Sequence, residues 1–419
     1  MSELKRHYVV IGAGIVGSSC AWHLLRDGHQ VTLVDYGLPG QATSFGNAGC
    51  ISCNAVIPFS YPGVLRHIPR WLFDPTGPLY IRWRHLHKVL PWMYRFWRAG
   101  SMAQVEAIAR AQTELMATVR ADYELILRET GAEWMHRKNG FIMLYDREAD
   151  YQRDAWQFEL RDRLGQKWQR LSPAELSELE PALADCPAAK DGVALYDSMW
   201  DHLIDPGEVT RSIAEAAFSN GAKWVQERVT AIEPEGKSVR VRLSSGRAIE
   251  ASGAVIAAGV WSGRLLDQLG VRVPLVAKRG YHTMVHNSNV EISHPVMAAS
   301  RFFMLTPMRL GLRLAGTAEF AAIDAEPDYR RARVLLDHAR NYLPDLEGES
   351  CSEWMGQRPM MPDSKPVIGP VPAHPSVLCA FGHGHYGLTQ GPTSGRIIAD
   401  LAAGREAHLD LSPFAVDRF

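Results

Sequence analysis

A six-residue run near the end of the chain combines residue types that ligand sites require. From Gly382 to Gly387 the sequence reads GHGHYG, directly before a segment with helical apolar spacing. Glycine lets the backbone approach a ligand closely, and imidazole titrates nearest to neutral pH. The start of a helix adds free N–H groups and a positive dipole end, which stabilise negative charge. The run therefore predicts an anion-stabilising site ahead of a helix that begins at about Thr393.

Arg358, in the sequence GQRP, is the second candidate. A guanidinium matches a carboxylate in bidentate geometry, which supplies orientation as well as energy. The following proline restricts Arg358 to an extended or turn conformation, so the direction of its side chain is set by the backbone. A surface arginine in a proline-containing turn is the alternative interpretation, and the residues alone leave both open.

The third candidate opens the chain. The apolar run His7–Ile11 leads into GAGIVG, then a helical segment, then a second apolar run that ends in Asp35. In this order Gly12 permits a tight turn, Gly14 lets the backbone approach a pyrophosphate, and Gly17 allows close helix packing. Asp35 is placed to bind a ribose hydroxyl. The pattern predicts a dinucleotide at the helix N-terminus, with a glycine turn lacking a ligand as the alternative.

The stretch after Asp35 favours a flavin over a nicotinamide. A nicotinamide domain would continue with another helix and strand, whereas here the sequence GLPGQATSFGNAGCIS has no strand period. Small polar groups of this kind suit the lining of an extended ligand. The predicted lining residues are Thr43, Ser44, Asn47, Gly49 and Ile51.

Length and composition are those of an ordinary globular protein. The 419 residues suffice for two domains, and a formal net charge of −1 argues against nucleic acid as the main partner. Six scattered cysteines do not form a disulfide scaffold, so a reducing compartment is expected. Cys50 and Cys53 form a Cys-x-x-Cys pair without a second pair for zinc. No metal site is predicted, and packed thiols or a redox pair remain the interpretations.

Tryptophans alternate with basic residues from residue 67 to residue 100, where Asp74 is the single acid. This mixture suits an anionic membrane surface or an electron-acceptor partner, and the alternative is a packed element with solvated arginines. No apolar run approaches the roughly eighteen residues that a membrane span needs, and no signal peptide is expected. The expected location is the cytoplasm, either in solution or on the inner face of the membrane.

Five motifs together resemble the D-amino acid oxidase-like family of FAD enzymes, and within it the D-amino acid dehydrogenases of D-proline-like substrates such as cis-4-hydroxy-D-proline. The motifs are GAGIVG (12–17), TSFGNAG (43–49), VIAAGVWSGRL (255–265), GQRPMMPDSKPVIG (356–369) and the glycine-rich run with its helix (380–404). They are spread over the whole chain. The resemblance implies FAD bound without a covalent link, because the tethering cysteine of sarcosine-oxidase relatives is missing near residues 368–370.

The resemblance also implies the architecture. It predicts an α/β fold in which a Rossmann-like FAD-binding domain is combined with a discontinuous α+β substrate domain built on an antiparallel sheet. The FAD domain is expected to take residues 1–85, 196–270 and 351–419. The substrate domain is expected to take residues 86–195 and 271–350.

Residue roles follow from the same resemblance. Arg358 would bind the substrate carboxylate, Tyr281 would add a polar contact, and His385 would tune the amine or bind the carboxylate, although some relatives carry arginine there. His383 is expected only to cap a turn. The further cofactor contacts implied are Ile15, Val16, Val229, Ala258, Gly259, Trp261, Gly384, Tyr386, Gly387, Leu388 and Thr389.

The reaction implied is dehydrogenation of a small D-amino acid by hydride transfer from the α carbon to flavin N5, with electrons passed to a quinone or another respiratory acceptor. Oxygen as the acceptor is an alternative, as is a secondary-amine oxidase of the glycine or sarcosine type. A flavin protein that modifies tRNA lacks support from the charge. The oligomeric state is not predicted.

Overall fold

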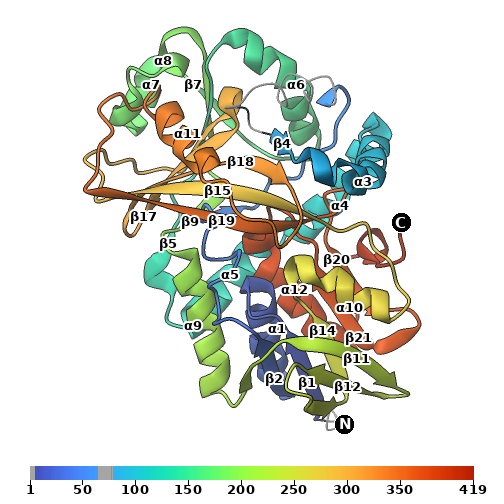
Figure 1. The fold of residues 1–419 in the computed structure, drawn as a ribbon. Coiled ribbons are helices and arrows are strands. Elements are labelled where there is room, and N and C mark those ends of the chain that lie inside the picture. The colour runs from blue at the N-terminus through green and yellow to red at the C-terminus, as the bar shows by residue number, and fades with distance from the viewer. Residues whose placement is uncertain (1–4, 65–76, 78) are drawn as a thin grey trace.

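A parallel sheet forms the lower half of the molecule in Figure 1. The computed structural model describes residues 5–64, 77 and 79–419. The short apolar runs of the N-terminus pair in parallel and are buried, as expected for strands covered on both faces. The sheet has the order β10 (Lys223–Gln226), β2 (Gln30–Asp35), β1 (His7–Ile11), β14 (Gly253–Ile256), β21 (His374–Phe381) and antiparallel β20 (Val367–Val371).

Helices cover one face of this sheet and a small antiparallel sheet covers the other (Figure 1). The helices of this half are α1 (Ile15–Arg26), α4 (Met102–Met116), α5 (Val119–Glu129), α9 (Pro206–Ser219), α10 (Ser262–Gln268) and α12 (Gly387–Ala402). The small sheet consists of β11 (Val229–Glu235), β12 (Ser238–Leu243) and β13 (Ala248–Ala251). The α/β class with a Rossmann-like domain is confirmed.

A larger, mainly antiparallel sheet forms the upper half. Its strands follow the order β19 (Ser350–Met360), β15 (Val276–His286), β18 (Gly311–Phe320), β17 (Phe303–Met308), β16 (Val296–Ala298), β6 (Phe141–Tyr145), β8 (Val193–Asp197) and β7 (Gln169–Leu171), with β4 (Leu79–Ile81) beside β18. The helices of this half are α3 (Leu86–Ala99), α6 (Glu148–Arg163), α7 (Pro173–Leu179), α8 (Pro187–Asp191) and α11 (Arg330–Ala339).

Two of the expected domain boundaries differ from the sheet pairing. Strand β19, which carries Arg358, pairs with β15 in the upper sheet, although residues 351–419 were expected in the FAD domain. Strand β4 also joins the upper sheet. Helices α4 and α5 contribute instead to the hydrophobic core of the lower half, because apolar residues such as Val105 and Ile126 pack with those of α1 and α12.

Helix α12 begins at Gly387, six residues earlier than expected from the sequence. Pro392 lies inside the helix and has no N–H for the carbonyl of Leu388, four residues before it. The hydroxyl of Tyr123 donates to that carbonyl instead, at 2.5 Å. A side chain from α5 therefore replaces the missing backbone bond and lets the helix run through the proline.

A third, three-stranded sheet joins β3 (Cys50–Ser52), β9 (Trp200–Leu203) and β5 (His136–Arg137). All six cysteines are free, and burial raises the pKa of Cys50 and raises that of Cys53 to about 12. Both are therefore protonated, packed thiols. Within the described part of the chain, no cluster of side chains could hold a metal ion and no helix is long and apolar enough to cross a bilayer.

Candidate active site

Two cavities meet between the halves of the molecule. The first, of about 350 Å³, runs along the carboxyl ends of the parallel strands. The second, of about 470 Å³, lies beneath the large sheet. Thr43, Asn47 and Gly384 line both, so the two form one continuous site.

The glycines of GAGIVG shape the first cavity. Gly12 has φ +108°, and a Cβ there would lie 2.5 Å from the carbonyl oxygen of Ala257. A Cβ on Gly17 would lie 1.8 Å from the carbonyl oxygen of Gly12, so helix α1 packs on the turn only because residue 17 has no side chain. At Gly14 the nearest atom would be the hydroxyl of Ser44, at 3.4 Å. Gly14 therefore leaves its backbone open to the cavity, as a bound pyrophosphate requires.

Polar groups at the same turn suit a dinucleotide. The Asp35 carboxylate accepts hydrogen bonds from the backbone N–H groups of Ala13 (2.7 Å) and Gly37 (3.0 Å), one on each oxygen. Each oxygen keeps a second acceptor position for a ribose hydroxyl. Ser44 accepts from the N–H of Ile15 at 3.0 Å, which leaves its own proton for a phosphate oxygen. These groups suit the ribose and the pyrophosphate of FAD.

Most predicted cofactor residues line this first cavity: Gly12, Gly14, Ile15, Val16, Asp35, Thr43, Ser44, Asn47, Val229, Ala258, Gly259, Trp261, Gly384, Gly387 and Leu388. Gly49, Ile51 and Thr389 line neither cavity. A Cβ on Gly49 would strike the carbonyl of Leu203 at 2.3 Å, Ile51 is fully buried in the core, and the Thr389 hydroxyl bonds to Ser52. We therefore correct these three to packing residues.

In the glycine-rich run Gly382–Gly387, the backbone N–H that was expected to meet the ligand at Gly384 is already hydrogen-bonded within the protein. The N–H of Gly384 donates to the carbonyl of Pro359 at 3.0 Å, so it is not available to a ligand. Because α12 begins at Gly387, the first-turn N–H groups of Gly387 and Leu388 lack intrahelical partners, and both residues line the first cavity. The anion-stabilising helix end is therefore present, and it stands at Gly387. Tyr386 lines the second cavity instead.

Three nitrogen-bearing side chains converge in the second cavity: Arg358, Lys278 and His385. Lys278 and Arg358 are paired neighbours in strands β15 and β19. The Arg358 guanidinium fills the space beside Gly280, where a Cβ would lie 2.0 Å from its Nη1. Burial lowers the pKa of Arg358 to about 10, so it remains a cation at neutral pH. A half-buried cation that lines a cavity in this way is suited to a substrate carboxylate.

Lys278 and His385 differ in protonation from ordinary residues of their type. Burial, together with the nearby Arg358 charge, lowers the pKa of Lys278 to about 7. Its Nζ lies 5.1 Å from the ring centroid of Phe59. Burial also lowers the pKa of His385 well below its ordinary value, so this imidazole is neutral. The His385 Nε2 atom is buried without a hydrogen-bond partner, and it can serve a substrate group.

His383 has a structural role, in line with the prediction. Its Nε2 bonds to the Ser394 hydroxyl at 2.9 Å, and burial lowers its pKa to about 3. Apolar side chains make most of the remaining cavity wall. They include Phe59, Phe141, Met143, Trp200, Met297 and Met304.

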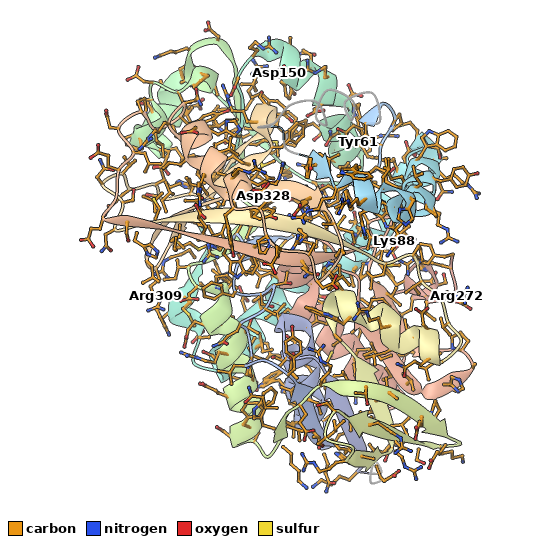
Figure 2. All side chains as sticks on the ribbon, viewed as in Figure 1. Tyr61, Lys88, Asp150, Arg272, Arg309 and Asp328 are labelled. Carbon is orange, nitrogen blue, oxygen red and sulfur yellow. The ribbon has the colours of Figure 1, made fainter. Side chains whose placement is uncertain are left out.

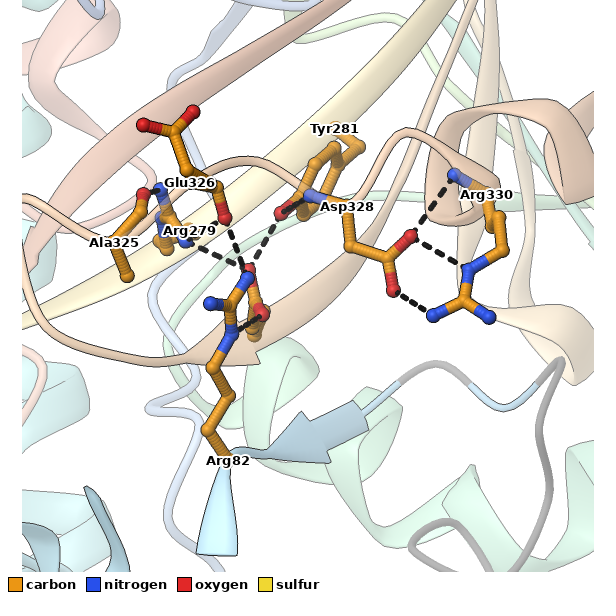
Figure 3. A network of polar contacts seen from close by, with 8 residues as sticks. Arg82, Arg279, Tyr281, Ala325, Glu326, Asp328 and Arg330 are labelled. Atoms are coloured by element: carbon orange, nitrogen blue, oxygen red, sulfur yellow. Dashed lines mark hydrogen bonds and ion pairs between the residues drawn. The ribbon is translucent and has the colours of Figure 1, made fainter. Parts of the chain in front are cut away.

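Tyr281 borders the cavity, but its hydroxyl does not accompany Arg358. Successive side chains of β15 point to opposite faces of the sheet, so Tyr281 leaves the face shared by Lys278 and Arg358. The Tyr281 hydroxyl donates to Glu319 at 2.5 Å and accepts from the N–H of Asp328, within the network drawn in Figure 3. The predicted polar contact to substrate is therefore corrected to a structural bond.

Two functional candidates were missed from the sequence. Lys278 shows no local motif, and only its register opposite Arg358 identifies it. Arg313 donates from its guanidinium to the backbone carbonyls of Phe45 (3.1 Å) and Asn47. It thereby holds the loop that lines both cavities, and its partners lie more than 260 residues away in the chain.

Known proteins are similar to this chain in sequence. Residues 7–401 match the family described as DAO, FAD dependent oxidoreductase. A D-amino-acid oxidase of Bradyrhizobium diazoefficiens is 35% identical, with 99% of both chains covered. A D-amino acid dehydrogenase of Paramagnetospirillum magneticum is 33% identical, with 98% of both covered.

Solved structures share the fold. A glycine oxidase from Geobacillus kaustophilus matches with a TM-score of 0.76 at 22% identity, covering 99% of both chains. An L-proline dehydrogenase from P. horikoshii also has a TM-score of 0.76, at 18% identity, covering 99% of this chain and 98% of that one. Since one family match spans nearly the whole chain and full-length relatives exceed 30% identity, the protein belongs to the DAO family of FAD-dependent oxidoreductases, and FAD is its cofactor.

Proposed function

We propose that the protein dehydrogenates D-amino acids whose carboxylate is bound by Arg358. The observation that carries the proposal is the Arg358 guanidinium, a half-buried cation that fills the space beside Gly280 in the cavity adjoining the FAD cleft. Bound FAD supplies the hydride acceptor, its N5 atom, for the hydrogen on the substrate α carbon. The two relatives, a D-amino-acid oxidase and a D-amino acid dehydrogenase, support the D stereochemistry.

Lys278 is the group proposed to take the amine proton. An amino acid arrives as an ammonium, and only the neutral amine can supply the electron pair that accompanies loss of hydride. With its pKa lowered to about 7, Lys278 is neutral in half of the molecules at that pH and can accept the proton. His385, which is neutral, would orient the amine or the carboxylate through its unpartnered Nε2.

The helix end at Gly387 and Leu388 completes the site. Its N–H groups and dipole favour negative charge at the cavity, and FAD gains negative charge when it is reduced. The cofactor is proposed to be held without a covalent bond. Acid precipitation of the purified protein should therefore release all flavin colour into the supernatant, and colour that stays with the pellet would contradict this.

The walls of the cavity suit an apolar substrate group. Phe59, Phe141 and Trp200 offer flat apolar surfaces against which a D-proline-like ring, including cis-4-hydroxy-D-proline, would pack. The test is anaerobic loss of the flavin absorbance on addition of D- and L-amino acids, glycine and sarcosine. Bleaching by D-isomers alone is expected. Bleaching by glycine or sarcosine alone would replace the proposal with a secondary-amine oxidase.

The proposed electron acceptor is a membrane quinone, because helix α3 presents a surface that suits a bilayer. Exposed apolar side chains follow helical spacing through the short 3-10 helix Trp83–His85 and into α3: Trp83, Leu86, Leu90, Tyr94 and Trp97, between 40% and 75% exposed. Arg84, Lys88, Arg95 and Arg98 flank them, and Figure 2 shows Lys88 at the surface. Trp71 and its neighbours in the basic stretch lie outside the described residues.

A helix packed in the protein core would not leave these aromatic side chains in water. A helix at a membrane interface instead places tryptophan, tyrosine and leucine in the headgroup layer, and its basic residues contact anionic lipid. The opposite face of α3 contributes Trp92, Met93 and Phe96 to the substrate cavity. Docking of α3 would therefore bring the cavity wall to the bilayer.

Flotation with vesicles tests this acceptor surface. Vesicles with phosphatidylglycerol should carry the protein at low salt, with less binding at high salt or with pure phosphatidylcholine. The variant Trp97→Ser with Tyr94→Ser should reduce binding, whereas Trp134→Ser, at a site 55% exposed elsewhere, serves as the control. Equal binding of all three proteins would refute the surface. If oxygen reoxidises the reduced flavin faster than a quinone does, the oxidase alternative is favoured. The Bradyrhizobium relative is named as an oxidase of this kind.

A further inference from the structure

A second arginine lies in the substrate cavity, on helix α6. Asp154, Gln157 and Arg161 all line the cavity, and their spacing of three and four residues places them on one face of that helix. This makes a polar strip opposite the otherwise apolar and aromatic wall. Arg358 belongs to strand β19, so the cavity receives cations from two separate elements.

Within the part of the chain that the structure describes, the Arg161 guanidinium is not engaged in an ion pair. Its Nε atom is buried without a hydrogen-bond partner, and its Cζ lies 5.2 Å from the ring centroid of Phe158. Among the described residues, none forms an ion pair or hydrogen bond with it. Burial lowers its pKa, since desolvation outweighs the neighbouring acids, yet an arginine remains charged. The Arg161 side chain as a whole is half-buried and lines the cavity, where an anionic group of a ligand would pair with it.

The two carboxylates that act electrostatically on Arg161, those of Asp197 and Asp154, already accept hydrogen bonds from other groups. Asp197 accepts hydrogen bonds from the Asn54 amide at 2.6 Å and from the N–H of Met199 at 2.9 Å. Asp154 accepts from the Tyr145 hydroxyl at 3.2 Å. The position is therefore suited to an anionic group on the substrate rather than to a cationic one.

We infer that Arg161 binds the side-chain carboxylate of an acidic D-amino acid while Arg358 binds its α-carboxylate. The inference rests on the proposed reaction and on the proposed role of Arg358, and it places an acidic side chain, in place of the D-proline-like ring, on the α6 side of the cavity. A guanidinium distinguishes a carboxylate from an amide of the same shape, because the charge-assisted bidentate bond is lost with the amide. D-glutamate and D-glutamine, and D-aspartate and D-asparagine, are the matched pairs.

The first experiment compares kcat/KM for each pair. The wild-type protein should favour the acid over its amide by about 10- to 100-fold, which is the effect of losing one charge-assisted hydrogen bond. In Arg161→Met this ratio should fall to about 1 or lower, mainly through KM, and Arg161→Lys should restore part of it. Arg163→Met, at an exposed arginine of the same helix paired with Glu106, is the matched control and should keep the wild-type ratio.

A binding measurement keeps the inference testable without turnover. Calorimetry should show that glutarate binds the FAD-loaded protein more tightly than butyrate, and that Arg161→Met removes the difference. An acid-to-amide ratio near 1 in the wild type, or an equal loss for both partners in Arg161→Met, would overturn the inference. If no D-amino acid reduces the flavin while glutarate still depends on Arg161, the proposed reaction fails and the anion site stands.

Discussion

Adding one methyl group at Gly280 should disable substrate binding without touching Arg358 itself. A Cβ at this position would lie 2.0 Å from Nη1, 2.1 Å from Cζ and 2.2 Å from Nη2 of Arg358. Carbon and nitrogen atoms in contact stand about 3.5 Å apart, so in Gly280→Ala the guanidinium must withdraw by about 1.5 Å. The end of a long side chain can do so, and the fold should therefore survive.

The magnitude follows from the lost orientation. Misplacement of a binding group by about 1 Å can cost about 100-fold in rate, and one hydrogen bond to a charged group contributes about 1.5–3 kcal/mol. We therefore expect kcat/KM for D-amino acids to fall about 100-fold in Gly280→Ala, equivalent to about 2.7 kcal/mol. Arg358→Met removes the whole cation and should lower kcat/KM by about 1,000-fold.

The assay is anaerobic flavin reduction by D-alanine, with flavin content and unfolding temperature measured on each protein. Gly263→Ala is the control, because its Cβ would meet nothing closer than 3.7 Å. In the Arg358→Met background, Gly280→Ala should add less than about 0.5 kcal/mol, as expected if it acts through Arg358. A Gly280→Ala protein that keeps kcat/KM within twofold, or a fully additive double variant, would refute the reasoning.

Three further predictions concern other parts of the site. The value of kcat/KM should rise as the pH increases past about 7, where Lys278 loses its proton, and Lys278→Met should remove this inflection. If the pH profiles of the wild-type and Lys278→Met proteins superimpose, Lys278 is not the base. Tyr123→Phe leaves the Leu388 carbonyl without its donor and should lower the free energy of unfolding by about 1–3 kcal/mol in urea, whereas unchanged stability would show that α12 does not need this bond. Gly17→Ala should abolish the bound flavin absorbance, because its Cβ would lie 1.8 Å from the Gly12 carbonyl, and a normally loaded protein would contradict the packing.

Local patterns predicted the cofactor cleft well. The turn at Gly12, the open backbone at Gly14 and the packing at Gly17 depend on residues within one strand–turn–helix unit, and the structure places Gly12 and Gly14 in the cleft wall as expected. Gly49 was misassigned, because its glycine is required by the distant carbonyl of Leu203. The sequence can indicate that a position requires glycine, but it does not show which atom would clash with a side chain there.

The start of α12 shows the same limit for secondary structure. Glycine and Pro392 both disfavour helix, so the sequence alone indicates a later start than Gly387. The Tyr123 hydroxyl comes from a helix more than 250 residues earlier and removes the cost of the proline. Local propensity was therefore overridden by one tertiary hydrogen bond.

The sequence by itself determined the dinucleotide turn and the apolar strands of the parallel sheet, because each depends on neighbours along the chain, whereas Arg358 was singled out by the family resemblance. Only the tertiary structure decided what surrounds Arg358. The strand register brings Lys278 beside it and leaves room at Gly280, whereas the alternation of β15 turns Tyr281 to Glu319. These contacts join residues far apart in the chain, and their spacing in sequence carries no information about distance in the folded protein.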